Sequence, residues 1–388
     1  MSVTAPLGFR AAGVPAGLKP SGQPDVAVVL NDGPSRSAAA VFTTNRVEAA
    51  PVTWTRQVVA GGRVRAVVLN SGGANACTGS PGFQDTHATA EHLAAAIATL
   101  SDEVGAGEIA VCSTGLIGER LPMDKLLPGV DAAVAEASRA GGLAAADAIR
   151  TTDTVVKIAF RRPDSYSIGG MAKGAGMLAP GLATMLCVLT TDADLEPAQL
   201  DAALRAATAV TFDRLDTDGC MSTNDTVLLM ASGAAGVKPD KTEFTLALTE
   251  VCADLARQLQ LDAEGANKMI SIEVVGAASE ADAVTAGRAV ARNNLLKCAI
   301  GGEDPNWGRV LSAVGTTDAV FAPDRLNVAI NGVWVCRAGA AGDERSKVDL
   351  KSRDVTITVD LSAGPHSAII LTTDLTTAYV HENSAYST

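Results

Sequence analysis

A threonine near the middle of the chain is the first residue that could do chemistry. Thr184 stands between a glycine-rich stretch, residues 169–176, and an apolar run, residues 182–191, that is typical of a buried strand. Most threonine hydroxyls in such places satisfy a backbone group. A hydroxyl at the first turn of a buried strand, preceded by a loop that carries the cation Lys173, also suits a nucleophile or a backbone cut after Ala183.

A second candidate is the turn Ser113-Thr114-Gly115, which leaves the predicted strand 108–112. Such a turn directs successive backbone N–H groups, together with the Thr114 hydroxyl, toward one point. Hydrogen-bond donors arranged in this way bind an oxyanion. A strand-to-helix turn with a capping threonine explains the pattern equally well.

Two more polar positions lie at the ends of predicted elements. The triplet Thr151-Thr152-Asp153 precedes a predicted strand at 154–160, and Glu264 follows a long amphipathic helix, 243–261. Glu264 beside a glycine is a reasonable site carboxylate, although a solvated glutamate at a helix end is commoner. The histidines do not favour a zinc site or a histidine triad, because two are five apart and the others are isolated. They are His87, His92, His366 and His381.

Composition restricts the class of protein. The 388 residues are 47% hydrophobic but only 3% aromatic, so the cores must be built from Ala, Val, Leu and Ile. The formal net charge of -12 argues against nucleic acid as a partner. No apolar run approaches the roughly 20 residues of a membrane helix, and no signal peptide is evident. The seven cysteines are scattered without a C-x-x-C pair, which predicts reduced thiols and a cytoplasmic location.

The elements that must position these residues alternate between strands and helices. Apolar runs predict strands at 26–30, 39–44 and 64–70, then at 226–230 and 271–275. Helical spacing marks the segments 85–100, 131–150, 196–208, 243–261 and 281–292. Short strands are predicted at 327–331, 333–336, 355–359 and 369–371. The roles of the loops 70–79 and 302–310 stay open.

Taken together, these motifs resemble the ornithine acetyltransferase family, the glutamate N-acetyltransferases of arginine biosynthesis. The match runs essentially end to end, and eight motifs in register are highly specific. They are NSGGANACTG at 70–79, CSTGLIG at 112–118, TTD at 151–153, MAKGAGMLAPGLATML at 171–186, CMSTNDT at 220–226, DAEG at 262–265, GEDPNWGRV at 302–310 and the terminal ENSAYST.

The resemblance implies an α/β (α+β) sandwich, with sheets packed between helices, that processes itself. Cleavage between Ala183 and Thr184 would give an α chain, residues 1–183, and a β chain, residues 184–388, assembled as an α2β2 heterotetramer. Thr184 would be the nucleophile, with Thr114 and Gly115 as the oxyanion hole. The substrate-binding positions implied are Lys173, Thr184, Glu264, Asn383, Thr388 and one of Thr151 and Thr152.

The implied reaction is a ping-pong transfer of acetyl from N-acetylornithine to glutamate through an ester on Thr184. The α-amine freed by cleavage, with a reference pKa of about 7.7–8.0, would be the base. No metal or dissociable cofactor is expected, and whether acetyl-CoA also serves as donor is open. Two alternatives remain: a self-processing amidase or aminopeptidase of the same fold, with water as acceptor, and a non-catalytic protein that binds a small molecule.

Overall fold

The structure is a computed structural model that describes residues 2–98, 104–179 and 185–385. The first sheet has the strand order β1-β2-β4-β5, in which β4 and β5 run parallel and the other neighbours antiparallel. Its strands are β1 (Phe9–Val14), β2 (Val26–Asn31), β4 (Ala66–Asn70) and β5 (Ile109–Ser113).

The second sheet packs face to face against the first and has the order β3-β9-β8-β7-β6. Its strands are β3 (Ser37–Phe42), β6 (Lys157–Arg161), β7 (Ile168–Lys173), β8 (Leu186–Thr191) and β9 (Thr226–Ala231). The central strand β8 pairs antiparallel with β7 and parallel with β9. The run of apolar residues predicted as a buried strand is therefore the middle of this sheet.

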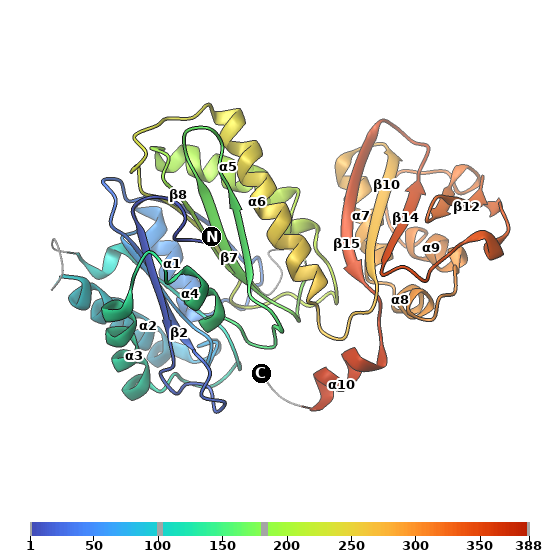
Figure 1. Ribbon diagram of the computed structural model, residues 1–388. Helices are drawn as coiled ribbons and strands as arrows, with labels where there is room; N and C mark the ends of the chain where they lie inside the picture. The colour runs from blue at the N-terminus through green and yellow to red at the C-terminus, as the bar shows by residue number, and fades with distance from the viewer. Residues whose placement is uncertain (1, 99–103, 180–184, 386–388) are drawn as a thin grey trace.

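Helices cover the outer faces of both sheets, which gives a sandwich of helices, two sheets and helices (Figure 1). The helices α2 (Gly79–Ala98) and α3 (Met123–Glu136) pack on the first sheet. The helices α5 (Pro197–Ala209) and α6 (Lys241–Leu261) pack on the second. The short helices α1 (Ala50–Ala60) and α4 (Gly142–Ala148) contribute side chains to the core between the sheets.

Continuous apolar runs form the strands because each strand faces two cores. In β8, Leu186 and Val188 point between the sheets, whereas Cys187 and Leu189 point toward α5 and α6. Alternate residues of a strand point to opposite faces, so a strand covered on both sides must be apolar at every position. The alanine-rich composition fits the core between the sheets, which holds Ala27, Ala38, Ala40 and Ala110.

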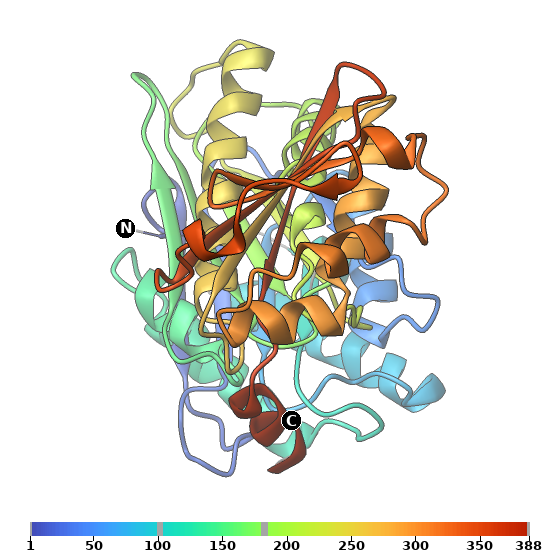
Figure 2. The ribbon, with the colours of Figure 1, turned by 90° about the vertical axis from the view of Figure 1, so that its right-hand side faces the viewer.

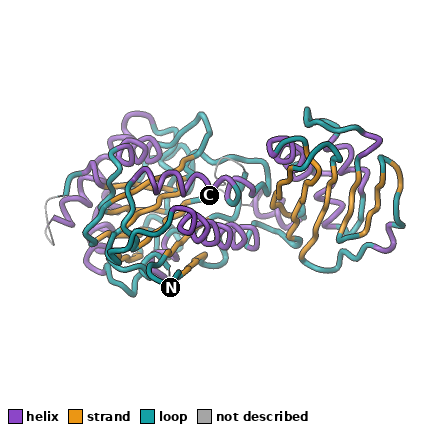
Figure 3. Tube along the Cα trace, turned by 90° about the horizontal axis from the view of Figure 1, so that it is seen from above, coloured by secondary structure: helices purple, strands orange, loops and turns teal. Residues whose placement is uncertain are grey.

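The C-terminal third forms a separate lobe around a third sheet (Figure 3), which has the order β13-β12-β11-β14-β10-β15. Its strands are β10 (Met269–Ala277), β11 (Asn327–Ile330), β12 (Val333–Arg337), β13 (Ala340–Ala341), β14 (Asp354–Asp360) and β15 (His366–Thr373). Its helices are α7 (Glu280–Ala291), α8 (Asn294–Gly301) and α9 (Trp307–Val314). The loop at 302–310 leads into α9, where Trp307 packs against the core of this lobe. The last helix, α10 (Thr377–Ala385), extends below the two lobes (Figures 1 and 2).

The predicted fold class, an α/β sandwich with sheets packed between helices, is confirmed. No helix within the described residues is long and apolar enough to cross a membrane. Three local predictions were wrong. The helix predicted from Asp85 begins at Gly79, and the single helix predicted at 131–150 is two, because Ser138 pairs with Ala11 of β1 between them.

The third wrong prediction concerns the glycine-rich stretch, whose first glycines lie inside β7 rather than in a loop. A Cβ on Gly169 would lie 2.2 Å from the Ser2 carbonyl oxygen, and one on Gly170 would lie 2.9 Å from Leu189. Glycine at these two positions therefore permits close packing on both faces of the strand.

Candidate active site

Lys173 and Thr114 meet in a buried contact, although 59 residues separate them in sequence. Lys173 ends β7 and Thr114 follows β5, so the contact joins the two sheets. The Lys173 Nζ donates to Thr114 Oγ1 at 3.2 Å, and the Lys173 side chain is buried. Burial lowers the pKa of the Lys173 ammonium, while the Asp153 carboxylate opposes that shift. A cation thus lies directly beside the turn that the sequence predicted as an oxyanion site.

The turn at Thr114 and Gly115 is held by the loop 70–79. The Asn70 carbonyl accepts the Thr114 N–H at 2.9 Å, and the Gly73 N–H donates to the Thr114 carbonyl at 3.0 Å. Gly115 has a φ of +129°, and a Cβ there would lie 2.8 Å from the Gly73 nitrogen, so only glycine fits. The loop 70–79, whose role the sequence left open, is the scaffold of this turn.

One part of the oxyanion prediction needs correction. The sequence predicted that successive backbone N–H groups of this turn point toward an oxyanion, but the Thr114 N–H is bonded to the Asn70 carbonyl. Two donors remain for an oxyanion. One is the Thr114 hydroxyl, whose oxygen accepts from Lys173 and whose hydrogen is thereby free to point elsewhere. The other is the Gly115 N–H, which has no hydrogen-bond partner among the residues that the structure describes.

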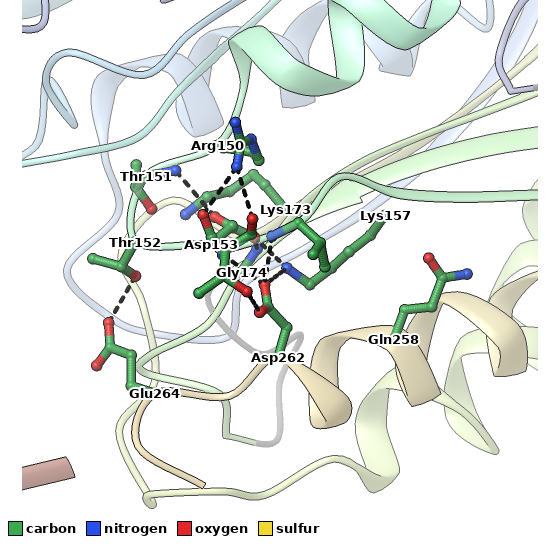
Figure 4. Close-up of polar contacts among 12 residues, drawn as sticks. Arg150, Thr151, Thr152, Asp153, Lys157, Lys173, Gly174, Gln258, Asp262 and Glu264 are labelled. Carbon is green, nitrogen blue, oxygen red and sulfur yellow. Dashed lines mark hydrogen bonds and ion pairs between the residues drawn. The ribbon is translucent and has the colours of Figure 1, made fainter. Parts of the chain in front are cut away.

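Two other predicted substrate-binding residues donate hydrogen bonds to the Glu264 carboxylate. Thr152 Oγ1 donates to one carboxylate oxygen at 2.7 Å (Figure 4), and Asn383 Nδ2 of α10 donates to the other at 2.9 Å. The Glu264 N–H donates to the Ala175 carbonyl at 2.9 Å. Because Ala175 is two residues after Lys173, this bond holds the backbone of Glu264 close to the end of β7. Thr152, rather than Thr151, is the threonine at this carboxylate.

A cavity of about 500 Å³ opens beside this group, at the junction of the sandwich with the C-terminal lobe. Thr152 and Glu264 line it, together with residues of α10 and of the loop after α6. The volume suits a small molecule of the size of an amino-acid derivative. Its polar residues are the carboxylates Asp262, Glu264 and Glu382 and the neutral Thr152, Thr154 and Asn267.

Asp153 links the cations of the site and was not predicted as a site residue. Its carboxylate accepts from the Gly174 N–H at 2.7 Å, from Lys157 Nζ at 2.6 Å and from the Thr151 N–H at 3.0 Å (Figure 4). Burial alone would raise the pKa of Asp153, but Lys173 and Lys157 outweigh it and hold that pKa at about 2. The only sequence signal for Asp153 is its place in the triplet at 151–153.

Asp225 is a second buried carboxyl group that the sequence did not single out. It is fully buried, and its Oδ1 accepts the Met185 N–H at 3.0 Å. Burial raises the pKa of this carboxyl well above its usual value. Asp225 therefore fixes the first described residue after the predicted cleavage site. Its neighbour Asn224 donates to the Ser113 carbonyl at 2.8 Å and so also supports the oxyanion turn.

Three predicted residues, Ala183, Thr184 and Thr388, lie outside the described residues. Of the others, the structure forms two pairings: Lys173 with Thr114, and Thr152 and Asn383 with Glu264. Two of the four histidines, His87 and His92, lie on α2, where His92 contacts Asp131 of α3 at 2.9 Å.

Comparison with known proteins gives matches over the whole chain. A model described as the ArgJ family matches residues 10–388. The arginine biosynthesis bifunctional protein ArgJ of Thermobifida fusca is 76% identical over 388 residues, which is 100% of both chains. Its counterpart from Streptomyces coelicolor is 66% identical over 387 residues, again 100% of both chains. Among solved structures, an ornithine acetyltransferase complexed with ornithine from Mycobacterium tuberculosis is 61% identical, covering 48% of this chain and 96% of that one, with a TM-score of 0.46.

Proposed function

The chain belongs to the ArgJ family, as its motifs predicted, and we propose that it transfers acetyl from N-acetylornithine to glutamate in arginine biosynthesis. The observation that carries the proposal is the paired arrangement of predicted residues: a cation beside the oxyanion turn, and a carboxylate held by Thr152 and Asn383 beside a small cavity. A buried cation can form a charge-assisted hydrogen bond with a substrate carboxylate, and Glu264 can form one with a substrate amine.

Thr184 is the proposed nucleophile, generated when the chain cleaves itself between Ala183 and Thr184. The new α-amine takes the hydroxyl proton, and the oxygen attacks the acetyl carbonyl of N-acetylornithine. The tetrahedral oxyanion accepts from the Thr114 hydroxyl and the Gly115 N–H, each donor contributing on the order of 10²–10³ in rate. The proton passes to the leaving nitrogen, ornithine departs, and acetyl-Thr184 remains.

Glutamate then completes the cycle. Its neutral α-amine attacks the ester carbonyl, and the second tetrahedral intermediate uses the same two donors. The α-amine of Thr184 takes one proton from the attacking nitrogen and passes it to the Thr184 oxygen as the C–O bond breaks, which releases N-acetylglutamate. Lys173 binds a substrate carboxylate and Glu264 an ammonium group. Glu264 suits this role because each of its oxygens accepts only one hydrogen bond from the described protein, which leaves further lone pairs for a ligand.

The two fragments, residues 1–183 and 184–388, would stay together after cleavage. In the second sheet, β8 and β9 of the later fragment lie between β3 and β7 of the earlier one. Both fragments also contribute to the site, because Lys173, Thr114 and Thr152 belong to the first and Glu264 and Asn383 to the second. Assembly into an α2β2 heterotetramer and a cytoplasmic location are part of the same proposal.

Acetyl-CoA is the proposed second donor. The relatives from Thermobifida fusca and Streptomyces coelicolor are both called bifunctional. Incubating the protein with N-acetylornithine, with and without glutamate, tests the main activity. N-acetylglutamate formed only with both substrates is expected, whereas acetate released without glutamate would instead indicate the hydrolase. The same assay with acetyl-CoA in place of N-acetylornithine tests the second donor.

A further inference from the structure

A second cavity, of about 730 Å³, lies beside β3, the edge strand of the second sheet, and five arginines line it. Residues of α5, of α7 and of the segment 212–214 between the lobes form its other walls. The arginines that line it are Arg56, Arg205, Arg214, Arg288 and Arg292. The clustering is notable because the formal net charge of the chain is -12.

Carboxylates hold most of these guanidinium groups in place. Arg214 Nη2 lies 2.6 Å from Glu280, and Arg292 Nε lies 2.7 Å from the buried Asp216. The more exposed pairs are Arg205 with Asp201 at 2.9 Å and Arg56 with Glu48 at 2.6 Å. One carboxylate, Asp213, lies in the cavity wall itself. These pairs orient the arginines but also offset much of their charge, so the sum of charges does not by itself define an anion site.

Two buried nitrogens distinguish this cavity from a neutral salt-bridge network. Arg214 Nη1 and Arg288 Nε are buried, and neither has a hydrogen-bond partner within the described chain. Arg288 also forms no ion pair with any described residue; its Nη2 donates only to the Asp213 carbonyl, at 2.9 Å. A buried N–H of a charged group that lacks an acceptor is unfavourable. A ligand with negatively charged oxygens would supply the acceptors that Arg214 Nη1 and Arg288 Nε lack.

We propose that this cavity binds the phosphate groups of a phosphorylated small molecule. The planar guanidinium fork matches a phosphate, because two parallel N–H groups can bind two of its oxygens. Arg288 of α7 lies one helical turn before Arg292, the residue that caps the helix, and Arg214 lies in the segment 212–214. Burial lowers the pKa of Arg288, while the Asp216 and Asp213 carboxylates oppose that shift, and a bound anion would oppose it further.

The cavity adjoins the elements that flank the predicted nucleophile. Thr43, in its wall, donates its N–H to the Asp225 carbonyl at 3.0 Å, and the Asp225 side chain holds Met185. Met221, also in the wall, pairs with Leu178. The wall of this cavity is thus tied to described residues on both sides of the predicted cleavage site, Leu178 and Met185. Acetyl-CoA, with phosphates at one end and its thioester at the other, is a ligand whose chemistry suits a phosphate site in this position. The assignment of acetyl-CoA as the ligand rests on the proposed function. The assignment of an anion site rests only on the arginines of the cavity.

Titration calorimetry on the processed protein tests the site. The probes are pyrophosphate and adenosine 3′,5′-bisphosphate, which separate a free phosphate source from the nucleotide end of a coenzyme. We expect the nucleotide to bind more tightly, with affinity falling as salt rises. Arg288→Gln should weaken binding by about tenfold or more, because it removes a guanidinium whose buried Nε has no acceptor in the described chain. If neither probe binds the unaltered protein, the proposal fails.

Matched variants separate the site from general charge effects. Arg161→Gln removes an arginine outside the cavity that contacts Glu250 and Asp254 of α6, and it should change affinity less than about twofold. Arg205→Gln alters an exposed side chain of the cavity and remains informative if an Arg288 variant does not fold. Equal affinity in the cavity variants and the Arg161→Gln control would overturn the proposal.

Kinetics then identify the ligand. If the site serves acetyl-CoA, Arg288→Gln should raise the KM for acetyl-CoA by about tenfold and leave the KM for N-acetylornithine unchanged. Tight binding of pyrophosphate with no change in either KM would assign the site to free phosphate. Failure of the proposed function would look different, because the unaltered protein would then not transfer acetyl from N-acetylornithine at all.

Discussion

Lys173 pairs with Leu186 at the end of the antiparallel ladder between β7 and β8. The predicted cut between Ala183 and Thr184 lies in the chain segment that connects these two strands. The ladder from Ile168 paired with Thr191 to Lys173 paired with Leu186 therefore joins the two fragments that the cut would create. Cleavage there would release neither strand from the sheet.

This relationship predicts how the processed protein behaves. Denaturing electrophoresis should resolve two fragments with a boundary at residues 183 and 184, whereas size-exclusion chromatography under native conditions should give one species that contains both. Thr184→Ala should leave the chain intact and inactive, with the same thermal unfolding profile within a few degrees. A single unbroken chain in fully active material, measured by mass spectrometry, would contradict the mechanism.

Thr114 provides the sharpest test of the oxyanion site. Thr114→Val keeps the shape of the side chain but removes the hydroxyl that accepts from Lys173. We expect kcat to fall by about 10²–10³, with a small change in KM, because the bond to the oxyanion forms only in the transition state. Thr114→Ser retains a hydroxyl and should keep most of the activity. Equal losses in the two variants would show that packing, rather than hydrogen bonding, matters there.

Thr151 and Thr152 form a matched pair for the substrate pocket. Thr152→Val removes the hydroxyl that donates to Glu264 at 2.7 Å, so the carboxylate loses a fixed orientation. We expect a rise of about tenfold in the KM for N-acetylornithine, corresponding to one hydrogen bond to a charged group. Thr151→Val should be close to the unaltered enzyme, because the hydrogen bond of Thr151 to Asp153 uses the backbone N–H, which the substitution keeps. Steady-state kinetics of both variants decide the assignment.

Asp153 predicts a loss of stability in acid. Its pKa in the folded protein is about 2, below the ordinary value of 3.8, so the folded state favours the charged form. The stabilisation is fully present above about pH 4 and is lost as the pH falls toward 2, and its size is about 2 kcal/mol. Asp153→Asn should unfold at a lower temperature than the unaltered protein at pH 7. The difference in unfolding midpoint should shrink below about pH 3.

Asp225 predicts the opposite dependence on pH. Burial raises the pKa of this carboxyl, so the folded state favours the protonated form, and its contribution to stability is lost as the pH rises through the folded pKa. Asp225→Asn keeps an acceptor for the Met185 N–H and has no charge to bury. The variant should match the unaltered protein near pH 4 and melt at a higher temperature as the pH rises. Identical melting curves across that range would contradict a buried, proton-retaining Asp225.

Local sequence patterns predicted most of the elements because burial on two faces leaves a strong signal. The apolar runs at β2, β8 and β9 and the helical spacing of α5, α6 and α7 appear close to the predicted positions. The pattern misled where tertiary contacts outweigh local preference. Gly169 and Gly170 are typical of a loop, yet they lie in β7 and pair with β8. They are glycines because the neighbouring backbone and Leu189 leave no room for a side chain.

The sequence by itself determined the family and the candidate residues, because motifs are local and their order along the chain can be read directly. Only the tertiary structure decided which of those residues meet. Lys173 reaches Thr114 across 59 residues and Thr152 reaches Glu264 across 112, and such contacts depend on how the sheets and lobes pack. For the same reason, the sequence did not single out Asp153 and Asp225 as site residues. A carboxylate's burial and its partners set its pKa, and both are properties of the packed chain.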